Sequence, residues 1–346
     1  MFEDIYRAGG FWSGTGPNAD IVLSTRVRLA RNLASVSFPH RQDEAETGLI
    51  KSIARRFCDE SEQRDRLLYL DLPSLSDDER RFLRERNLIT SEMESSARSS
   101  LIVHRGGGFV IMINEEDHFR IQVIHPGFQL METYRAADIV DDDLNRFVTY
   151  AYSDDFGFLT ACPSNAGTGL RVSIMVHLPV LSLIRSIPDV VRVVNDFGAD
   201  MRGTGGEGGK TLGSMYLVTN HVSLGRSEVD IIEELDEVAS MIIEMEGDAR
   251  DDYVAQNGRE LEDRVWRSYG ILGNARLISY PDSMEQLSNL RMGVVLSIIK
   301  SVDLQTINDL MVKTQCSHLQ RSADRVFADN NECDAYRADY MRGHFN

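Results

Sequence analysis

Two hydrophobic stretches in the middle of the chain predict a pair of strands joined by a polar turn. Residues 109–113 are all apolar, which is typical of a strand buried on both faces. Residues 119–124 mostly alternate between apolar and polar side chains, which is typical of a half-buried strand. The turn between them, residues 114–118, carries three acids and a histidine. Because turns are commonly polar and only solvated, this turn becomes a candidate site only if other segments supply partners.

A similar alternation appears near the N-terminus. Residues 21–31 place Arg26 and Arg28 on one face of a predicted strand and Val27 and Leu29 on the other. Two arginines on one face repel each other unless an anion lies between them. The alternative is an edge strand whose charges are solvated.

Helical spacing of apolar residues predicts helices in much of the remaining chain. The predicted helices are residues 43–65, 77–87, 128–150 with an acidic interruption at 141–143, and 179–197 with a break at Pro188. Alternating patterns predict further strands at residues 170–178 and 214–222. Ser227 is expected to cap a long helix, and beyond residue 253 only helical patterns remain.

The length of 346 residues exceeds one comfortable hydrophobic core, so two domains are expected. The most polar interruption with glycine lies at residues 247–252. We therefore predict an α/β domain over residues 1–250 and an α-helical domain over residues 251–346.

The net charge of −17 makes a general nucleic-acid-binding protein unfavourable. Any anionic ligand must therefore be held by a local arginine cluster. No apolar run approaches the roughly 18 residues of a membrane span, and the N-terminus does not resemble a signal peptide. The four cysteines show neither a CxxC pair nor metal-binding spacing with histidine. These features predict a cytoplasmic protein with reduced thiols, no membrane partner and no protein-bound metal site.

The glycine-rich segment at residues 202–211 imitates two nucleotide motifs and satisfies neither. Residues 203–208 match the dinucleotide-binding pattern, which requires a strand before it and a helix after it. Here a strand is predicted to follow. Residues 209–211 resemble the end of a phosphate-binding loop that lacks its first glycine. What remains is a loop that could fold over a ligand, with Arg202 at its base and Glu207 near its tip.

The candidate site combines arginines with two acids and a thiol. The arginines at strand or loop positions suited to a polyanion are Arg26, Arg28, Arg120, Arg171 and Arg202. Arginine suits phosphate because its planar fork binds two oxygens at once and keeps its charge. Glu116 and Glu207 lie on separate turns, and Cys162 lies in a loop rich in proline and glycine. Phosphoryl transfer depends mostly on positioning and charge neutralisation, and two carboxylates facing the arginines would suit a cationic nucleophile.

Four segments carry a family resemblance. They are STRVRLARN (24–32), INEEDHFRIQ (113–122), CPSNAGTGLR (162–171) and RGTGGE (202–207). In order and spacing they resemble the signature blocks of the ATP:guanido phosphotransferases, the phosphagen kinase family, across about residues 20–250. The resemblance implies a largely antiparallel sheet flanked by helices, with ATP as cosubstrate and Mg²⁺ held mainly by the nucleotide.

The resemblance also implies roles for individual residues. The implied nucleotide-binding residues are Ser24, Thr25, Arg26, Val27, Arg28, Arg120, Arg171, Val172, Ser173, Ile174, Met175, Arg202, Gly203, Thr204, Gly205, Gly206 and Glu207. Glu116 and Glu207 would hold the substrate guanidinium, and Cys162 would lie against it as a thiolate. The chemistry agrees, because a guanidinium with a pKa above ~12 is not a nucleophile until a base takes its proton.

Within the family, the chain resembles the bacterial protein-arginine kinases. Creatine and arginine kinases carry a helical domain before the first block, whereas this sequence reaches Ser24 without one and continues into a helical C-terminal region. The resemblance implies phosphorylation of exposed arginines in proteins, marking them for a Clp ATPase and protease. A zinc-finger-type activator and a homodimer are further implied partners.

Two motifs depart from that branch. Its Arg-Asp-x-x-Arg-Ala motif, which reads phosphoarginine, is replaced at residues 333–338 by Cys-Asp-Ala-Tyr-Arg-Ala, which leaves Asp334 and Arg337 as candidate allosteric residues. The family histidine near the adenine has no obvious match around residues 88–92. Two alternatives remain: a kinase for a free guanidino compound such as L-arginine, and a catalytically silent adaptor that binds nucleotide or phosphoarginine. The presence of Glu116, Glu207 and Cys162 argues against the adaptor.

Overall fold

The computed structural model describes residue 5, residues 14–205 and residues 211–345. Gly206 and Glu207, two of the predicted site residues, lie outside the described residues.

The central element is an eight-stranded sheet in the order β2-β3-β4-β5-β1-β8-β10-β9, in which every neighbouring pair is antiparallel. The strands are β1 (Val22–Arg31), β2 (Leu67–Asp71), β3 (Ser100–His104), β4 (Val110–Ile113), β5 (Phe119–Pro126), β8 (Leu170–His177), β9 (Ala199–Gly203) and β10 (Met215–Asn220). A separate short hairpin comprises β6 (Tyr152–Ser153) and β7 (Gly157–Phe158). The predicted fold class, a largely antiparallel sheet flanked by helices, is confirmed. The edge-strand alternative for β1 is wrong, because β1 pairs with β5 on one side and β8 on the other.

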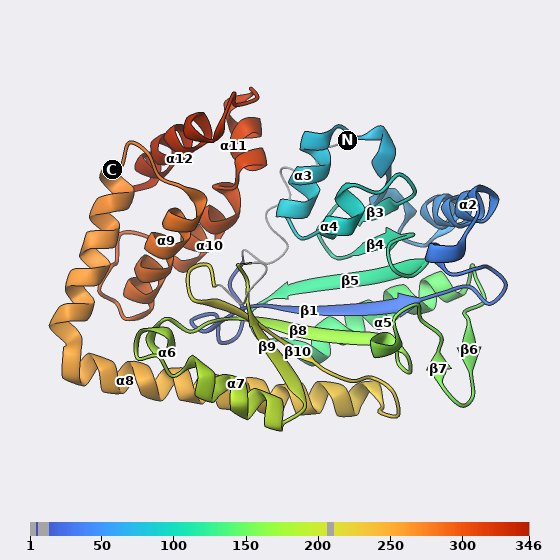
Figure 1. The fold of residues 1–346 in the computed structure, drawn as a ribbon, viewed down its shortest axis with the longest axis horizontal. Coiled ribbons are helices and arrows are strands. Elements are labelled where there is room, and N and C mark those ends of the chain that lie inside the picture. The colour runs from blue at the N-terminus through green and yellow to red at the C-terminus, as the bar shows by residue number, and fades with distance from the viewer. Residues whose placement is uncertain (1–4, 6–13, 206–210, 346) are drawn as a thin grey trace.

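The two faces of the sheet differ in chemistry. Val27 and Leu29 of β1 lie on the apolar face, which packs against α5 (Leu130–Asn145) and α8 (Glu228–Asn274) in one continuous core (Figure 1). Arg26 and Arg28, one residue out of phase, lie on the opposite face. The β2-β3-β4 end of that face is covered by α3 (Asp77–Glu85) and α4 (Ser91–Glu94). The middle of the polar face is left for the arginines.

Helix α8 is 47 residues long and begins at a capping box in which Ser227 and Asp230 exchange hydrogen bonds, as predicted. It runs along the apolar face, kinks at Asn257 and continues into the C-terminal helices (Figure 1). These are α9 (Tyr280–Val295), α10 (Leu304–Lys313), α11 (Cys316–Ala323) and α12 (Asn330–Phe345). The helical character beyond residue 253 is therefore confirmed, whereas the predicted domain boundary at residues 247–252 falls inside α8, and the division into two domains stays a prediction.

The C-terminal helices fold back towards the sheet. The backbone N–H of Ser317, on α11, donates to the carboxylate of Glu85, on α3, at 3.2 Å. Arg291 of α9 is fully buried and donates to the backbone carbonyl of Asp20, next to β1, at 2.9 Å. The C-terminal helices thus contact both α3 and the N-terminal end of β1.

The remaining helices are α2 (Glu44–Glu60), α6 (Pro179–Leu183) and α7 (Ile187–Asp196), close to the predicted ranges. The predicted acidic interruption at residues 141–143 is wrong. Asp141 is buried and binds the guanidinium of Arg31, with an Nη2–Oδ2 distance of 2.6 Å, so α5 continues through it. Within the described part of the chain, no helix has the length and apolar character needed to cross a bilayer.

Candidate active site

Five arginines come together on the polar face of the sheet. They are Arg26 and Arg28 on β1, Arg120 on β5, Arg171 on β8 and Arg202 on β9. Arg28 lies directly opposite Arg171, and Ala30 lies directly opposite Arg120. Directly opposed residues of antiparallel strands point to the same side, and the register continues through β10 to Arg202. Sheet pairing therefore gathers side chains that are up to 176 positions apart in the sequence.

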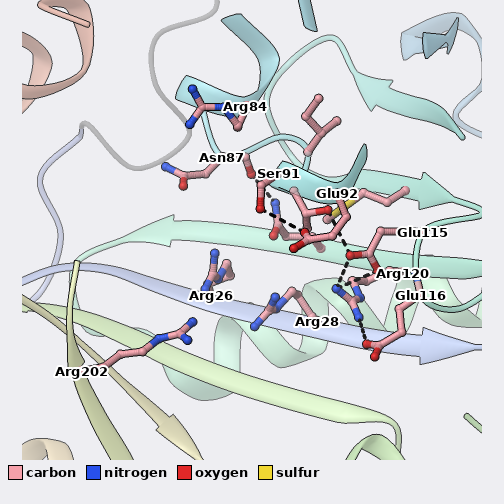
Figure 2. Close-up of a pocket in the computed structure, with 14 residues that line it drawn as sticks. Arg26, Arg28, Arg84, Asn87, Ser91, Glu92, Glu115, Glu116, Arg120 and Arg202 are labelled. Atoms are coloured by element: carbon pink, nitrogen blue, oxygen red, sulfur yellow. Dashed lines mark hydrogen bonds and ion pairs between the residues drawn. The ribbon is translucent and has the colours of Figure 1, made fainter. Parts of the chain in front are cut away.

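Four of these arginines, Arg26, Arg28, Arg120 and Arg202, line a cavity of about 770 Å³, which we call the arginine cavity (Figure 2). Its lining residues are Arg26, Arg28, Arg84, Asn87, Ile89, Thr90, Ser91, Glu92, Met112, Glu115, Glu116, Arg120, Gln122 and Arg202. Arg26, Arg28 and Arg202, from β1 and β9, lie on one side, whereas Arg120 from β5 lies on the other side with the acids of the β4–β5 turn (Figure 2). Of the five predicted arginines, only Arg171 is absent from this lining.

The electrostatics of the cavity favour an anion. Burial, followed by the charges of Arg202, Arg171 and Arg120, lowers the pKa of Arg26 to about 10. Burial and the neighbouring arginines also lower the pKa of Arg28 and of Arg171 below the ordinary value. The Nε of Arg28 is buried without a hydrogen-bond partner among the described residues. A polyanion such as a nucleotide phosphate chain would relieve this repulsion and supply the missing acceptor.

Two neighbouring acids of the β4–β5 turn hold the guanidinium of Arg120. Its Nη1 donates to Glu115 at 2.9 Å and its Nη2 donates to Glu116 at 2.8 Å. Glu115 is buried and also accepts from the hydroxyl of Thr90 at 3.1 Å, whereas the Glu116 side chain is 44% exposed. The sequence analysis selected Glu116 and missed Glu115. Only the hairpin geometry shows that both reach the same arginine.

A buried network joins this turn to the loop that carries Cys162. The Oδ1 of Asp117 accepts from the side chain of Asn32 at 2.6 Å and from the backbone N–H of Ala161 at 2.7 Å. The side chain of Asn32 in turn accepts from the backbone N–H of His118 at 2.9 Å. Asp117 is fully buried. It therefore fixes the turn of Glu116 relative to the residue that precedes Cys162.

Cys162 precedes a short 3₁₀ helix (Pro163–Asn165) and is half-buried, with its sulfur 3.0 Å from the hydroxyl of Ser164. It does not line the arginine cavity. It lies close enough to Arg171 that its negative charge would raise the pKa of that guanidinium. Cys162 and Arg171 thus lie near each other, outside the lining of the arginine cavity.

A second cavity of about 320 Å³ adjoins the arginine cavity and shares Arg84 and Asn87 with it. It lies between the sheet and the C-terminal helices and is lined by Leu23, Arg84, Glu85, Asn87, Met175, Thr204, Leu212, Met215, Tyr280, Met284, Met311 and Gln315. Met175 and Thr204 are among the predicted nucleotide-binding residues. The sulfur-containing and aromatic lining is suited to a flat apolar ring. We call it the apolar cavity.

The other predicted nucleotide-binding residues divide into those that lie at an arginine or a cavity and those whose side chains are buried in the core. Ser173 accepts from the Nε of Arg26 at 3.3 Å, and Thr204 follows β9 at the apolar cavity. The side chains in the second group lie in the buried core, away from the arginine cavity: Thr25, Val27, Val172 and Ile174. Ser24 is also buried. Sequence blocks identify a segment, but strand alternation decides which of its side chains reach the cavity.

The candidate allosteric residues Asp334 and Arg337 lie on α12. Arg337 is buried and donates to the backbone carbonyls of Thr314 and Ile278 at 2.7 and 2.9 Å, and to the sulfur of Cys333 at 3.2 Å. It also pairs with Asp334. The interior of the C-terminal helices therefore uses most of the donors of Arg337.

Comparisons with known proteins agree with this geometry. A family model described as ATP:guanido phosphotransferase, C-terminal catalytic domain, matches residues 48–249, and one described as protein-arginine kinase McsB C-terminal domain matches residues 258–346. The chain is 39% identical to a protein-arginine kinase of Bacillus subtilis (strain 168), covering 94% of this chain and 90% of that protein. It is 40% identical to a protein-arginine kinase of Geobacillus sp. (strain WCH70), covering 99% and 95%.

Solved structures show the same fold. The chain resembles the duplicated taurocyamine kinase from Schistosoma mansoni with a TM-score of 0.59 and 25% identity, over 65% of this chain and 33% of that one. It resembles lombricine kinase with a TM-score of 0.60 and 23% identity, over 68% of each chain.

Proposed function

The chain belongs to the ATP:guanido phosphotransferase family, and within it to the protein-arginine kinases, and we propose that it transfers the γ-phosphate of ATP to arginine side chains of proteins. The observation that carries this proposal is the set of five arginines on one sheet face, opposite Glu116. Like charges held together require a polyanion, and a carboxylate at its edge suits a cationic acceptor.

We place the phosphates of ATP in the arginine cavity and its base in the apolar cavity. The two cavities share Asn87 and Arg84, so one extended molecule can occupy both. Asn87 has a positive φ of 58° and its backbone carbonyl accepts from Gln122 at 2.8 Å, which fixes it at the junction. We propose that Asn87 lies near the base. It directly precedes residues 88–92, the segment in which the family histidine has no match.

Mg²⁺ fits this arrangement as an ion held mostly by the nucleotide. The described residues contain no group of three or more acidic, histidine or cysteine side chains placed to hold a metal. Glu92 and Glu115 nevertheless line the arginine cavity, and Mg²⁺ commonly combines phosphate oxygens, waters and one or two carboxylates. When bound, the ion would neutralise charge on the phosphates.

The acceptor guanidinium would enter beside Glu116. In the proposed step, Glu116 takes one proton from the guanidinium, a nitrogen lone pair attacks the γ-phosphorus, and the bond to the β–γ bridging oxygen breaks to release ADP. Arg120 holds Glu116 in place and faces the phosphates. We propose Cys162 and Glu207 as further contacts of the guanidinium; Glu207 is outside the described residues.

The test is incubation with ATP and either an unfolded arginine-rich protein or free L-arginine. The product should be acid-labile and alkali-stable, as expected for phosphate on nitrogen. We expect kcat/KM for the protein to exceed that for free arginine at least roughly a hundredfold, or about 2.7 kcal/mol. Comparable efficiency on the free amino acid would favour the free-guanidino kinase, and no transfer to either would favour the silent adaptor.

The wider setting is also proposed, from the family resemblance of the sequence rather than from contacts in the structure. Phosphorylated proteins would be marked for Clp-type proteolysis in the cytoplasm, with a zinc-finger-type activator and a homodimeric kinase. Co-purification of a tagged kinase with such an activator, and light scattering of the purified protein, test these two partners separately.

A further inference from the structure

A third cavity of about 400 Å³ lies on the other side of the two acids. It shares Glu115 and Glu116 with the arginine cavity and is lined further by Pro39, His40, Gln42, Ser96, Arg98, Asn114 and Ala161. Ala161 is the residue before Cys162. The cavity therefore starts where the acceptor guanidinium would sit and extends away from the phosphates. We call it the acceptor-side cavity.

Two buried side-chain amides in its lining have atoms without partners. Both Nδ2 and Oδ1 of Asn114, which is 6% exposed, lack a hydrogen bond within the described part of the chain. Nε2 of Gln42, which is 8% exposed, also lacks one. The Oε1 of Gln42 accepts from the hydroxyl of Thr47 at 3.3 Å, which orients the unsatisfied NH₂ group. Buried polar atoms normally have partners, so three unsatisfied atoms around one cavity indicate a polar ligand.

The position of Asn114 is fixed by its backbone. Its N–H donates to the carbonyl of His118 at 3.0 Å, and its own carbonyl accepts from the hydroxyl of Ser99 at 2.6 Å. The residue has a positive φ of 52°, a conformation that asparagine tolerates better than most residues. The amide is therefore held on a turn whose backbone is fixed by hydrogen bonds, directly before Glu115 and Glu116.

We propose that the acceptor-side cavity binds the main chain of the protein substrate next to the acceptor arginine. A side-chain amide donates and accepts at neighbouring atoms, as a peptide group does. Asn114 would pair with one peptide group, donating to its carbonyl and accepting from its N–H, and Gln42 would donate to a second carbonyl. This inference rests on the proposed function, because it names how that function selects arginine within a polypeptide.

The charges around the cavity fit the same occupant. Exposed Arg98 and His40 line this cavity together with Glu116, and the Nη1 of Arg98 donates to the carbonyl of Gln42 at 3.4 Å. Free arginine could offer its carboxylate to Arg98 and its α-ammonium group to Oδ1 of Asn114, but it brings two terminal charges that an arginine within a polypeptide lacks. A blocked arginine, with a peptide group on each side, satisfies both amides without any terminal charge. Comparing kcat/KM for the blocked arginine with kcat/KM for free arginine therefore distinguishes recognition of the main chain from recognition of the free amino acid.

The experiment measures kcat/KM for L-arginine, for Nα-acetyl-arginine N-methylamide and for an unfolded arginine-containing protein. Gln42→Met keeps the side-chain length and removes the amide. We expect the ratio of blocked to free arginine to fall about tenfold in this variant, the change typical of one lost hydrogen bond, mainly through KM. Gln256→Met, an exposed glutamine on α8, is the matched control and should keep the wild-type ratio.

A second variant, Asn114→Gly, guards against misfolding of the first, since glycine accepts the positive φ. It should lower the same ratio, while calorimetric titration of ADP reports whether the arginine cavity is intact. An equal loss on all acceptors, or no loss, overturns the inference. Wild-type protein that phosphorylates proteins but does not prefer blocked over free arginine also overturns it and leaves the proposed function standing. Wild-type protein that phosphorylates no protein overturns the proposed function itself.

Discussion

The Nη2 of Arg120 donates to the Oε2 of Glu116 at 2.8 Å across the turn between β4 and β5. In the proposed function, Arg120 faces the phosphates and Glu116 faces the acceptor. Their ion pair therefore couples the charge that binds ATP to the carboxylate that we assign as the base. A substitution at either residue should therefore affect both ATP binding and the activation of the acceptor.

Replacing Arg120 or Arg202 by alanine should weaken ADP binding by about 1.5–3 kcal/mol each, because a charged hydrogen-bonding contact to phosphate is lost. Arg120→Ala should in addition lower kcat, since Glu116 loses its partner, whereas Arg202 forms no ion pair with Glu116 within the described part of the chain. Calorimetric titration of ADP and steady-state kinetics measure the two effects.

The control for these variants is Arg192→Ala, which removes an exposed arginine of α7 that pairs only with Asp189 within the described residues. It should retain wild-type ADP affinity. If Arg120→Ala and Arg202→Ala also retain it, the nucleotide binds elsewhere.

Cys162→Ala should lower turnover strongly and change ADP affinity little, because the thiol lies outside the arginine cavity and we propose it as a contact of the acceptor guanidinium. Iodoacetamide should inactivate the wild-type enzyme, and ADP with an arginine substrate should protect it. Unchanged turnover in the alanine variant would remove Cys162 from the site.

Two other cysteines serve as internal references for that labelling. Burial raises the pKa of the Cys58 thiol to about 12, so Cys58 should react slowly. The hydrogen bond to Cys333 lowers the pKa of Cys316, so Cys316 is a second alkylation site. Peptide mapping should show that substrates protect Cys162 and leave the labelling of Cys316 unchanged.

Asp117→Ala should lower kcat about tenfold with little change in the KM for ATP, since the substitution releases the Cys162 loop from the turn of Glu116. The variant also leaves the side-chain amide of Asn32 short of an acceptor, so its unfolding free energy should fall by about 1–3 kcal/mol. A parallel loss of ADP affinity would instead indicate a general collapse of the site.

Stability should fall on acidification partly through His318. Burial, and then Arg86, Arg321 and Lys313, lower its pKa to about 3, against about 6.5 in the unfolded chain. Because the unfolded state then binds more protons between pH 6.5 and pH 3, the stabilisation present above pH 6.5 is lost as the pH falls, by about 2 kcal/mol at pH 5. His318 also packs on Phe82, with ring centroids 4.6 Å apart.

The measurement compares urea unfolding of the wild type and His318→Gln at pH 7.5 and pH 5. The wild type should lose more unfolding free energy between the two conditions than the variant. Burial raises the pKa of Glu85 to about 7, which gives the opposite pH dependence but is present in both proteins. Equal losses would show that His318 does not contribute.

Alternation along single strands predicted the arginine face well. Arg26 and Arg28 alternate with Val27 and Leu29, and the structure puts these pairs on opposite faces of a central strand. The α/β fold and the helical C-terminal region were likewise predictable from periodicity. β2, β3 and β9 were not predicted, and Arg202 lies in β9 rather than in a loop.

The polar contacts of the site could not be predicted in the same way. Glu115 and Glu116 are neighbouring glutamates that differ only in the direction in which the turn points their side chains. The hydrogen-bond partners of Asp117, Asn32 and Ala161, lie 85 and 44 residues away in the sequence. Asn114 and Gln42 meet at one cavity although they lie on separate elements. Such juxtapositions depend on sheet register and loop packing, which local patterns do not contain. The domain boundary was placed inside α8 for a related reason, because a glycine and several acids look like a linker but are tolerated in a long helix.

The contact between α3 and α11 closes a ring of contacting elements that runs from the sheet through α8 and the C-terminal helices back to α3. The chain leaves the sheet along α8, and Ser317 returns to Glu85 on the far side of the arginine cavity. Asn87 and Thr90, which line that cavity, follow α3 directly. A ring is mechanically stiffer than two bodies joined by one hinge, because it can widen only where a joint parts. Any motion that widens the arginine cavity by moving α3 away from the C-terminal helices must therefore break the contacts between α3 and α11. The free energy of those contacts adds to the cost of the motion.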